Sequence, residues 1–207
     1  LAAAIAVQTD PADRAVTLRR QVRTLTNQGR YAEAETTLAT ARAAAAQATG
    51  LSQFDQAMLL IEAGNLAIAR DRMASAETDL NAALAIMANA HSPSDSRLGL
   101  ALEPLGHAIS KRGGWALAEP VSERVLAVEQ ARPRKNNVRL GSALNDLGNI
   151  YSNTGRTALA IDVWRQSIVL AEAPTASQEL AMRLYNLGST LTKLRRRWQR
   201  RWLQMLA

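Results

Sequence analysis

Side chains that can form hydrogen bonds and ion pairs recur at a fixed spacing along the chain. The spacing is 42 residues through the first four copies, and the fifth copy lies two residues early. A central row is polar in every copy and holds Arg23, Asn65, His107, Asn149 and Ser189. Four residues before it lies the row Arg19, Ile61, Glu103, Asn145 and Tyr185, and four residues after it the row Asn27, Ala69, Lys111, Asn153 and Lys193. Amides of this kind donate and accept hydrogen bonds, and the cations favour an anionic partner.

No arrangement of side chains in the sequence predicts catalysis. The motifs G-x-S-x-G, G-x-x-x-x-G-K-[ST] and H-E-x-x-H, which mark nucleophile, phosphate-loop and zinc-protease sites, are absent. Paired acids such as Glu33 and Glu35 are expected on solvent-facing helix turns, where ion pairs with nearby arginines are the ordinary arrangement. We therefore expect no enzyme, no cofactor and no small-molecule substrate.

Metal binding and disulfide chemistry are not predicted either. The only histidines are His91 and His107, 16 residues apart, whereas a metal ion needs several converging ligands. The chain has no cysteine, so it offers neither a thiolate ligand nor a disulfide. The charge-free apolar stretch at residues 1–9 is too short for a membrane-spanning helix.

The polar rows belong to a repeat that runs through most of the sequence. The same shift aligns a glycine that follows a small or apolar residue at Gly64, Gly106 and Gly148. Seven residues later it aligns a turn residue at Gly29, Asp71, Gly113 and Gly155, and then an alanine at Ala34, Ala76, Ala118 and Ala160. A fixed period of this size indicates stacked supersecondary units that bury their apolar faces against one another.

Each repeat is predicted to be a pair of helices. Alanine and leucine dominate and the apolar spacing is helical, so the chain is expected to be all-α. In the fourth copy the pattern predicts a first helix over 142–154 and a second over 158–171. Gly155 lies between them and suits the left-handed conformation that often ends a helix. Gly148 and Ala160 are expected where the two helices approach closely.

The fourth copy resembles the tetratricopeptide repeat (TPR). The segment 145–151 reads NDLGNIY and is followed by Gly155, Ala160 and Trp164, which are the residue types and offsets of that family. The turn and second-helix half of the motif recurs at 29–34 and 113–120. The period of 42 residues, in place of about 34, is similar to that of the kinesin light chain subtype.

The resemblance implies a right-handed superhelical solenoid of about four and a half antiparallel hairpins. The expected units are 13–50, 51–92, 94–133, 135–173 and 175–207, in one array over 1–207. Residues 1–9 read as the end of a preceding repeat, and a cytoplasmic location is expected. Alternatively, Ala4, Ile5 and Ala6 are the cleavage site of a leader peptide, which would make the protein periplasmic or secreted.

The resemblance also implies that the first helices line a concave groove, to which the polar rows belong. Asparagines there would hold the backbone of an extended peptide, and the net basic charge would favour an acidic protein or peptide. The candidate groove residues are Arg19, Arg23, Asn65, Glu103, His107, Lys111, Asn145, Asn149, Asn153, Tyr185, Ser189 and Lys193. The alternative is that these are solvated residues of an exposed face with no ligand.

Residues 194–207 depart from the repeat. Arg195, Arg196, Arg197, Arg200 and Arg201 account for five of the seven net positive charges of the chain. Trp198, Trp202, Met205 and Leu206 fall on one helical face. The favoured interpretation is a second helix that docks its tryptophans on the preceding unit. The alternatives are an artificial end of the reading frame, since the repeat match stops at Leu194, or a membrane or nucleic-acid contact confined to 195–207.

The sequence therefore predicts a non-enzymatic scaffold that binds a peptide or protein segment. Two other functions stay open at this point. The array could be a regulatory or sensory part of a larger protein, beside a caspase-like protease, a kinase or a DNA-binding domain, since bacterial multidomain proteins contain repeats of this length. It could also form homo-oligomers through uncapped ends.

Overall fold

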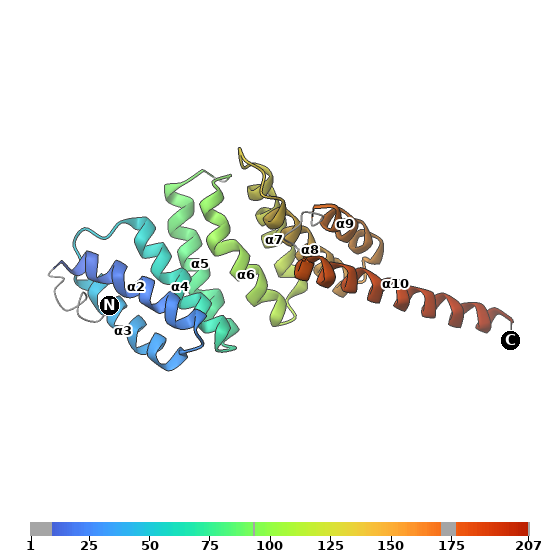
Figure 1. The fold of residues 1–207 in the computed structure, drawn as a ribbon, viewed down its shortest axis with the longest axis horizontal. Helices are drawn as coiled ribbons and strands as arrows, with labels where there is room; N and C mark the ends of the chain where they lie inside the picture. The colour runs from blue at the N-terminus through green and yellow to red at the C-terminus, as the bar shows by residue number, and fades with distance from the viewer. Residues whose placement is uncertain (1–9, 93, 171–176, 207) are drawn as a thin grey trace. The chain divides into compact units, whose positions relative to one another are not determined.

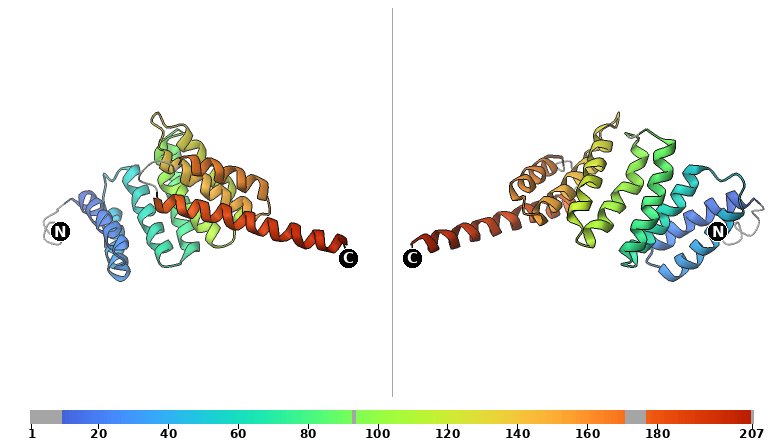
Figure 2. Two further views of the ribbon diagram at one scale, coloured as in Figure 1. Left: turned by 45° about the vertical axis from the view of Figure 1, so that its right-hand side comes forward. Right: turned by 180° about the vertical axis from the view of Figure 1, so that it is seen from behind.

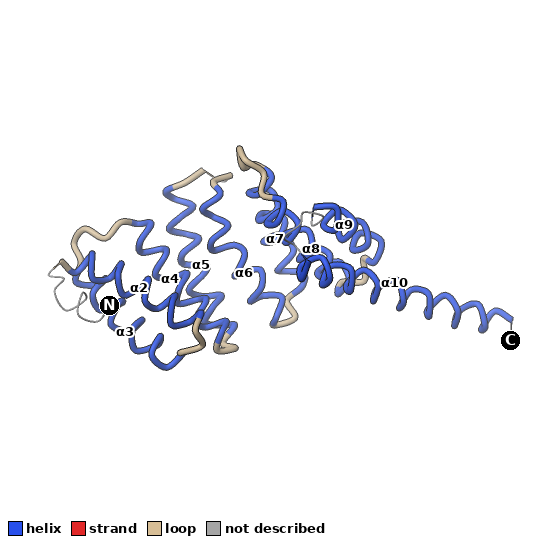
Figure 3. Tube along the Cα trace, in the orientation of Figure 1, coloured by secondary structure: helices blue, strands red, loops and turns tan. Residues whose placement is uncertain are grey.

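The computed structural model describes residues 10–92, 94–170 and 177–206, with the backbone alone for 177–179, 201–203 and 206. These residues form nine α-helices and one 3-10 helix, with no strand among them, as Figure 3 shows. The all-α fold predicted from the sequence is confirmed. The chain divides into two compact bodies, an N-terminal body over Leu1–Gly114 and a C-terminal body over Trp115–Ala207. The boundary falls inside the predicted third unit, 94–133.

The N-terminal body contains two complete hairpins and the first helix of a third (Figure 1). The helices are α2 (Pro11–Asn27), α3 (Tyr31–Gln47), α4 (Gln53–Ala69), α5 (Met73–Ala90), the 3-10 helix η1 (Ser96–Leu98) and α6 (Gly99–Lys111). Within this body α2 packs on α3, α4 on α5 and α5 on α6, while α4 also contacts α2 and α6. First helices of successive repeats are therefore neighbours.

The C-terminal body holds four helices. They are α7 (Trp115–Gln130), α8 (Asn137–Asn153), α9 (Thr157–Leu170) and α10 (Ser177–Leu206). Helices α8 and α9 form the hairpin expected from the fourth repeat, and α8 also packs on α7. Helix α8 begins at Asn137 and not at 142, because the Asn136 side chain accepts a hydrogen bond from the Arg139 amide at 3.1 Å and caps the helix there. The expected end of α9 at 171 lies outside the described residues.

The turns inside the hairpins adopt the left-handed conformation that the repeat landmarks predict. Gly29, Gly113 and Gly155 have φ angles of 74°, 78° and 79°, and Asp71 in the same position has a φ of 57°. Such angles favour glycine, since an L side chain there is strained. The prediction for Gly155 is confirmed.

Glycines in the first helices allow the second helices to approach closely. A Cβ atom added to Gly64 would lie 2.6 Å from Cγ of Leu80, and one added to Gly148 would meet the indole of Trp164. Leu80, Ala160 and Trp164 are buried. The close approach expected at Gly148 and Ala160 is thus confirmed, with Trp164 as the side chain that Gly148 admits.

Ion pairs join the second helix of one repeat to the turn between the two helices of the next repeat. Arg72 Nη2 lies 2.6 Å from Glu35 Oε1, and Arg112 Nη1 lies 3.0 Å from Glu77 Oε1, both in the N-terminal body. In the C-terminal body both amino groups of Arg156 donate to Glu119, at 2.6 and 2.5 Å. These acids of the second helices, which are half-buried, are thus used in stacking the repeats.

Helix α10 differs from the predicted fifth unit. Its 30 residues form a single helix that extends past α8 and α9 (Figure 2). No turn returns the chain at the position where the other repeats have one, and the side chain of Trp198 is 65% exposed. The prediction that 194–207 forms a docked second helix is wrong for Trp198, because the landmark Gly and Ala of the turn are replaced by the helix-forming residues Arg195 and Arg200.

Candidate functional site

The predicted groove residues all lie on first helices, as the repeat requires. In the N-terminal body, Arg19 and Arg23 are on α2, Asn65 is on α4, and Glu103, His107 and Lys111 are on α6. In the C-terminal body, Asn145, Asn149 and Asn153 are on α8, and Tyr185, Ser189 and Lys193 are on α10. Because α4 contacts both α2 and α6, the first set forms one surface, which we call the N-terminal wall. Because α10 contacts α8, the second set forms the C-terminal wall.

Most of these side chains are open to solvent. Those of Arg23, Glu103, His107, Lys111, Asn153, Tyr185 and Lys193 are exposed, and Asn65, Asn149 and Ser189 are half-buried. Arg19 and Asn145 are instead 8% and 4% exposed. Ile61, in the same row as these two, is 3% exposed. The expectation that this row is exposed is therefore wrong at these three positions, since the neighbouring first helix covers them.

Arg19 takes part in the packing of α2 against α4. Its Nη2 atom lies 3.7 Å from Oδ1 of Asp55 on α4. Burial lowers the pKa of the Arg19 guanidinium, while the nearby carboxylates of Asp55 and Glu62 oppose that shift. Arg19 is thus an internal ion-pair partner, and any contact it makes with a ligand would require it to leave Asp55.

Glu62 is a buried acid of the N-terminal wall that was not among the sequence-predicted residues. It is 4% exposed, on α4, beside Arg19 and Arg23 of α2. Burial raises the pKa of the Glu62 carboxyl, against the opposing effect of Arg23, of Arg19 and of a hydrogen bond from Asn65. The signal in the sequence was an acid in the otherwise apolar run 57–64. The Glu62 carboxyl thus interacts with the arginines of α2 and with the Asn65 amide.

On α6, three ionisable groups of the wall are spaced one helical turn apart. Glu103, His107 and Lys111 are all exposed. Partial burial, and then the ammonium of Lys111, lower the pKa of the His107 imidazole. The imidazole is therefore neutral at pH 7 and can both donate and accept a hydrogen bond.

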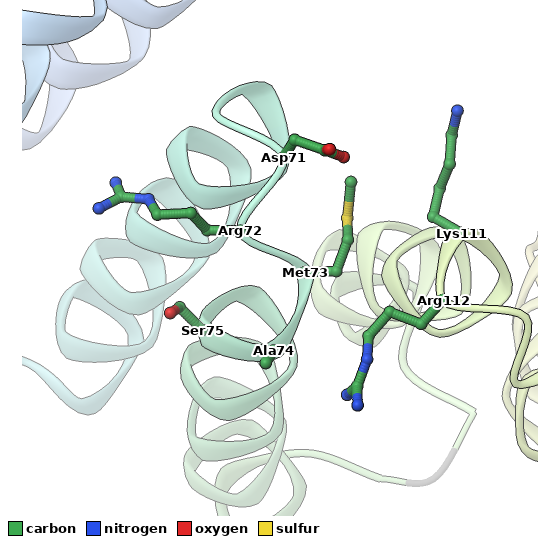
Figure 4. Close-up of a pocket in the computed structure, with 7 residues that line it drawn as sticks. All are labelled: Asp71, Arg72, Met73, Ala74, Ser75, Lys111 and Arg112. Carbon is green, nitrogen blue, oxygen red and sulfur yellow. The ribbon is translucent and has the colours of Figure 1, made fainter.

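Beside Lys111 the surface is hollowed. An open pocket of about 520 Å³ is lined by the α4–α5 turn at Asp71, Arg72 and Met73, by Ala74 and Ser75, and by Lys111 and Arg112 at the end of α6. Figure 4 shows that Lys111 projects on the same side as Asp71 and Met73, whereas Arg112 points the opposite way. The N-terminal wall therefore ends in a polar recess that could accept a side chain of a bound peptide.

In the C-terminal wall the asparagines are largely bonded to one another. Asn186 of α10 donates from Nδ2 to the Oδ1 atoms of Asn145, at 3.2 Å, and Asn149, at 3.3 Å. Asn153 donates from its Nδ2 to the backbone carbonyl of Asn149 at 2.8 Å. These amides connect α8 with α10, and Asn145 in particular is a structural contact and not an exposed peptide clamp.

Tyr185 is the aromatic residue of the C-terminal wall. Its side chain is 73% exposed, next in sequence to Asn186. Ser189 and Lys193 follow it one and two turns along α10. The exposed ring can pack on an apolar side chain of a ligand, while the hydroxyl of Ser189 and the ammonium of Lys193 bond to the backbone of that ligand.

The described residues were also compared with what a metal site and a membrane-spanning helix require. No three His, Asp or Glu side chains in the described ranges come close enough to hold a metal ion. No described helix combines the length and apolar character that crossing a membrane requires.

The fold is similar to that of solved TPR-like structures. A putative kinesin light chain with nearly identical TPR-like repeats from Podosopora anserina aligns with a TM-score of 0.76 at 17% identity, over 96% of this chain and 94% of that one. BtubC (BKLC) from P. vanneervenii aligns with a TM-score of 0.76 at 18% identity, over 86% of this chain and 74% of that one. No protein-family model and no curated protein sequence matches the chain.

These likenesses show the fold. The chain has a TPR-like helical repeat fold, and the fold recognised from the Leu-Gly, Gly and Ala offsets is confirmed.

Proposed function

We propose that the chain is a non-enzymatic scaffold that binds an extended, acidic peptide segment on its first-helix walls. The observation that carries the proposal is the arrangement of exposed polar groups on three adjacent first helices of the N-terminal wall. Arg23, His107 and Lys111 are exposed there, and the half-buried Asn65 is hydrogen-bonded to Glu62. The row continues from one repeat to the next, as an extended ligand needs.

Charge is expected to select the ligand. Glu62 is buried and interacts electrostatically with Arg19 and Arg23. The exposed charges among the wall residues are therefore the cations Arg23 and Lys111 and the acid Glu103. Exposed charges of this kind steer association and set preference more than they set affinity. An acidic segment would gain from both cations, and Glu103 would disfavour an acid placed directly over α6.

Rigid recognition is the expected mechanism. The wall is built from helices whose packing is fixed by the buried residues of the hairpins, including Leu18, Val22, Leu66 and Leu80. A preformed surface binds with little reorganisation, so the ordering cost falls on the peptide. The cytoplasmic location expected from the sequence stays a prediction.

The experiment compares labelled 12-residue peptides, Gly/Ser-rich with four aspartates or with four lysines, by fluorescence anisotropy at low and physiological salt. The aspartate peptide is expected to bind at least tenfold more tightly, with affinity falling as salt rises. Arg23→Glu should weaken it about fivefold or more, a loss on the order of 1 kcal/mol.

The matched control is Arg14→Glu. Arg14 is also exposed on α2, but it lies nine residues before Arg23 and therefore on the opposite side of the helix. The two variants carry the same charge change, so an equal loss in both would mean that only net charge matters. Unchanged affinity in Arg23→Glu would contradict the proposed site.

A further inference from the structure

Helix α10 carries the first-helix half of a hairpin, and no described helix follows it to form the second half of that hairpin. The pair Leu187 and Gly188 repeats the pair Leu147 and Gly148 of α8. Gly148 admits the indole of Trp164 from a second helix, whereas a Cβ atom added to Gly188 would meet no described atom within 4 Å. Glycine weakens an exposed helix and gives no benefit unless something packs closely against it. The open face at Gly188 therefore has the shape that receives a helix in the other repeats.

An apolar stripe runs along α10 on both sides of this glycine. Leu184, Leu191, Trp198 and Met205 follow one another at intervals of seven residues, with exposures of 50%, 42%, 65% and 70%. The three intervening positions hold Leu187 and Leu194, which are half-buried, and Arg201. A seven-residue repeat of this form is the seam by which one helix packs on another, and it spans about 32 Å of helix.

Basic side chains border the stripe. Arg195 and Arg197 are exposed and fall on its two flanks, while Lys193, Arg196 and Arg200 are exposed farther round the helix. After Glu179 the sequence of α10 contains no acid. Flanking positions of a helix seam determine which partner is accepted, because opposite charges face each other across it.

We propose that the stripe of α10 docks an amphipathic α-helix whose flanking residues are acidic. The helix would take the place of the missing second helix, with a bulky apolar residue over Gly188 as Leu80 and Trp164 lie over Gly64 and Gly148. The stripe shares α10 with Tyr185, Ser189 and Lys193 of the C-terminal wall, but none of its apolar residues belongs to either wall, so the proposal does not depend on peptide binding there.

Charge and geometry select this occupant over two others. A second copy of α10 would bring two sets of arginines together, which disfavours pairing. A membrane surface favours a broad apolar face, whereas Arg195 and Arg197 confine this stripe to a narrow seam. Gly188, which suits a closely packed helix, gives no advantage against lipid.

The test uses the full chain and two synthetic 28-residue peptides. Both have leucine at the two seam positions of four heptads, and one has glutamate and the other lysine at the flanking positions. By anisotropy in about 0.1 M salt, we expect the glutamate peptide to bind at least tenfold more tightly than the lysine peptide. Trp198→Asp should weaken it at least tenfold and Gln199→Asp less than threefold, since Gln199 is exposed one residue farther round the helix. Circular dichroism checks that both variants fold.

Four results would overturn the proposal. One is equal affinity for the two peptides, and another is equal loss in Trp198→Asp and Gln199→Asp. A third is that the chain sediments with phosphatidylserine vesicles, that Trp198→Asp abolishes this sedimentation, and that the glutamate peptide does not bind. This result would identify lipid as the ligand. The fourth is a dimer, seen by light scattering, that Trp198→Asp converts to monomer. Arg23→Glu should leave the affinity for the glutamate peptide unchanged, because Arg23 belongs to the N-terminal wall and not to α10.

Discussion

The indole of Trp164 lies directly against the backbone of Gly148, where any Cβ atom would collide with it. Trp164 is 2% exposed, so its ring has no space into which to move. This contact joins α8 to α9 and is the C-terminal counterpart of Gly64 against Leu80. It fixes how closely the two helices of a repeat approach, and through that the position of the polar row on the outer side of α8.

Gly148→Ala should destabilise the fold by about 1–3 kcal/mol, because the added methyl group overpacks a site that is closed by a buried ring. Gly188→Ala is the matched control, since the same change in open space on a helix should be neutral or stabilising by up to about 1 kcal/mol. Urea unfolding followed by circular dichroism measures both. Equal effects of the two substitutions would contradict the close packing at Gly148.

Asn145→Ala is expected to cost stability, on the order of 1–2 kcal/mol, because Asn145 is buried and accepts a hydrogen bond from Asn186. Asn153→Ala should change stability by less than about 0.5 kcal/mol, since Asn153 is exposed and bonded only within its own helix turn. The same urea experiment compares them. If Asn145→Ala proved as stable as the parent chain, the bridge between α8 and α10 would lack the structural role assigned to it.

Much of the fold was predictable from the sequence because it depends on local rules. The glycines at 29, 113 and 155 mark left-handed turns, and helical apolar spacing marks the helices between them. The exposure of Arg19 and Asn145 was predicted wrongly for a different reason. Whether a residue of a first helix reaches solvent depends on how closely the next first helix packs, and that distance is set by side chains 40 or so residues away in the sequence.

One feature of the candidate surfaces depends on long-range packing in the same way, and another depends on local helix propensity. Glu62 is hydrogen-bonded by Asn65 and faces arginines of another helix, which no single repeat reveals. The continuation of α10 follows from strong helix formers at 194–206 that outweigh the repeat pattern, since no glycine is present there to end the helix.

The buried carboxyl of Glu62 predicts a pH-dependent stability. Its pKa is raised in the folded chain, so the folded state binds the proton more tightly than the unfolded state does. The contribution to stability is therefore fully present below the unfolded pKa, near 4.5, and is lost as pH rises through the folded pKa. Glu62→Gln should remove this loss, so that its stability relative to the parent chain increases on going from pH 4.5 to pH 7.

Urea unfolding of the two chains at several pH values measures that difference. A difference that stays constant with pH would show that Glu62 ionises normally. A difference that grows in the opposite direction, with the variant losing stability as pH rises, would show that Arg19 and Arg23 outweigh the effect of burial.

Acidification is expected to strengthen the binding of an acidic peptide through His107. The pKa of the imidazole lies below its usual 6.5 in the free chain, so the ring gains its charge only as pH falls below that value. Affinity for the aspartate peptide should rise between pH 7 and pH 5, and His107→Ala should remove most of the rise. A rise of the same size in His107→Ala would assign the effect to other groups.

The most direct test of the account is to map where the aspartate peptide binds, by recording amide chemical shifts of the labelled chain during a titration. The proposed function predicts that the shifted amides cluster on α2, α4 and α6, around Arg23, Asn65 and His107, with α3 and α5 unaffected. Shifts confined to the second helices α3 and α5, or no saturable shifts on the first helices, would contradict the first-helix wall as the binding surface.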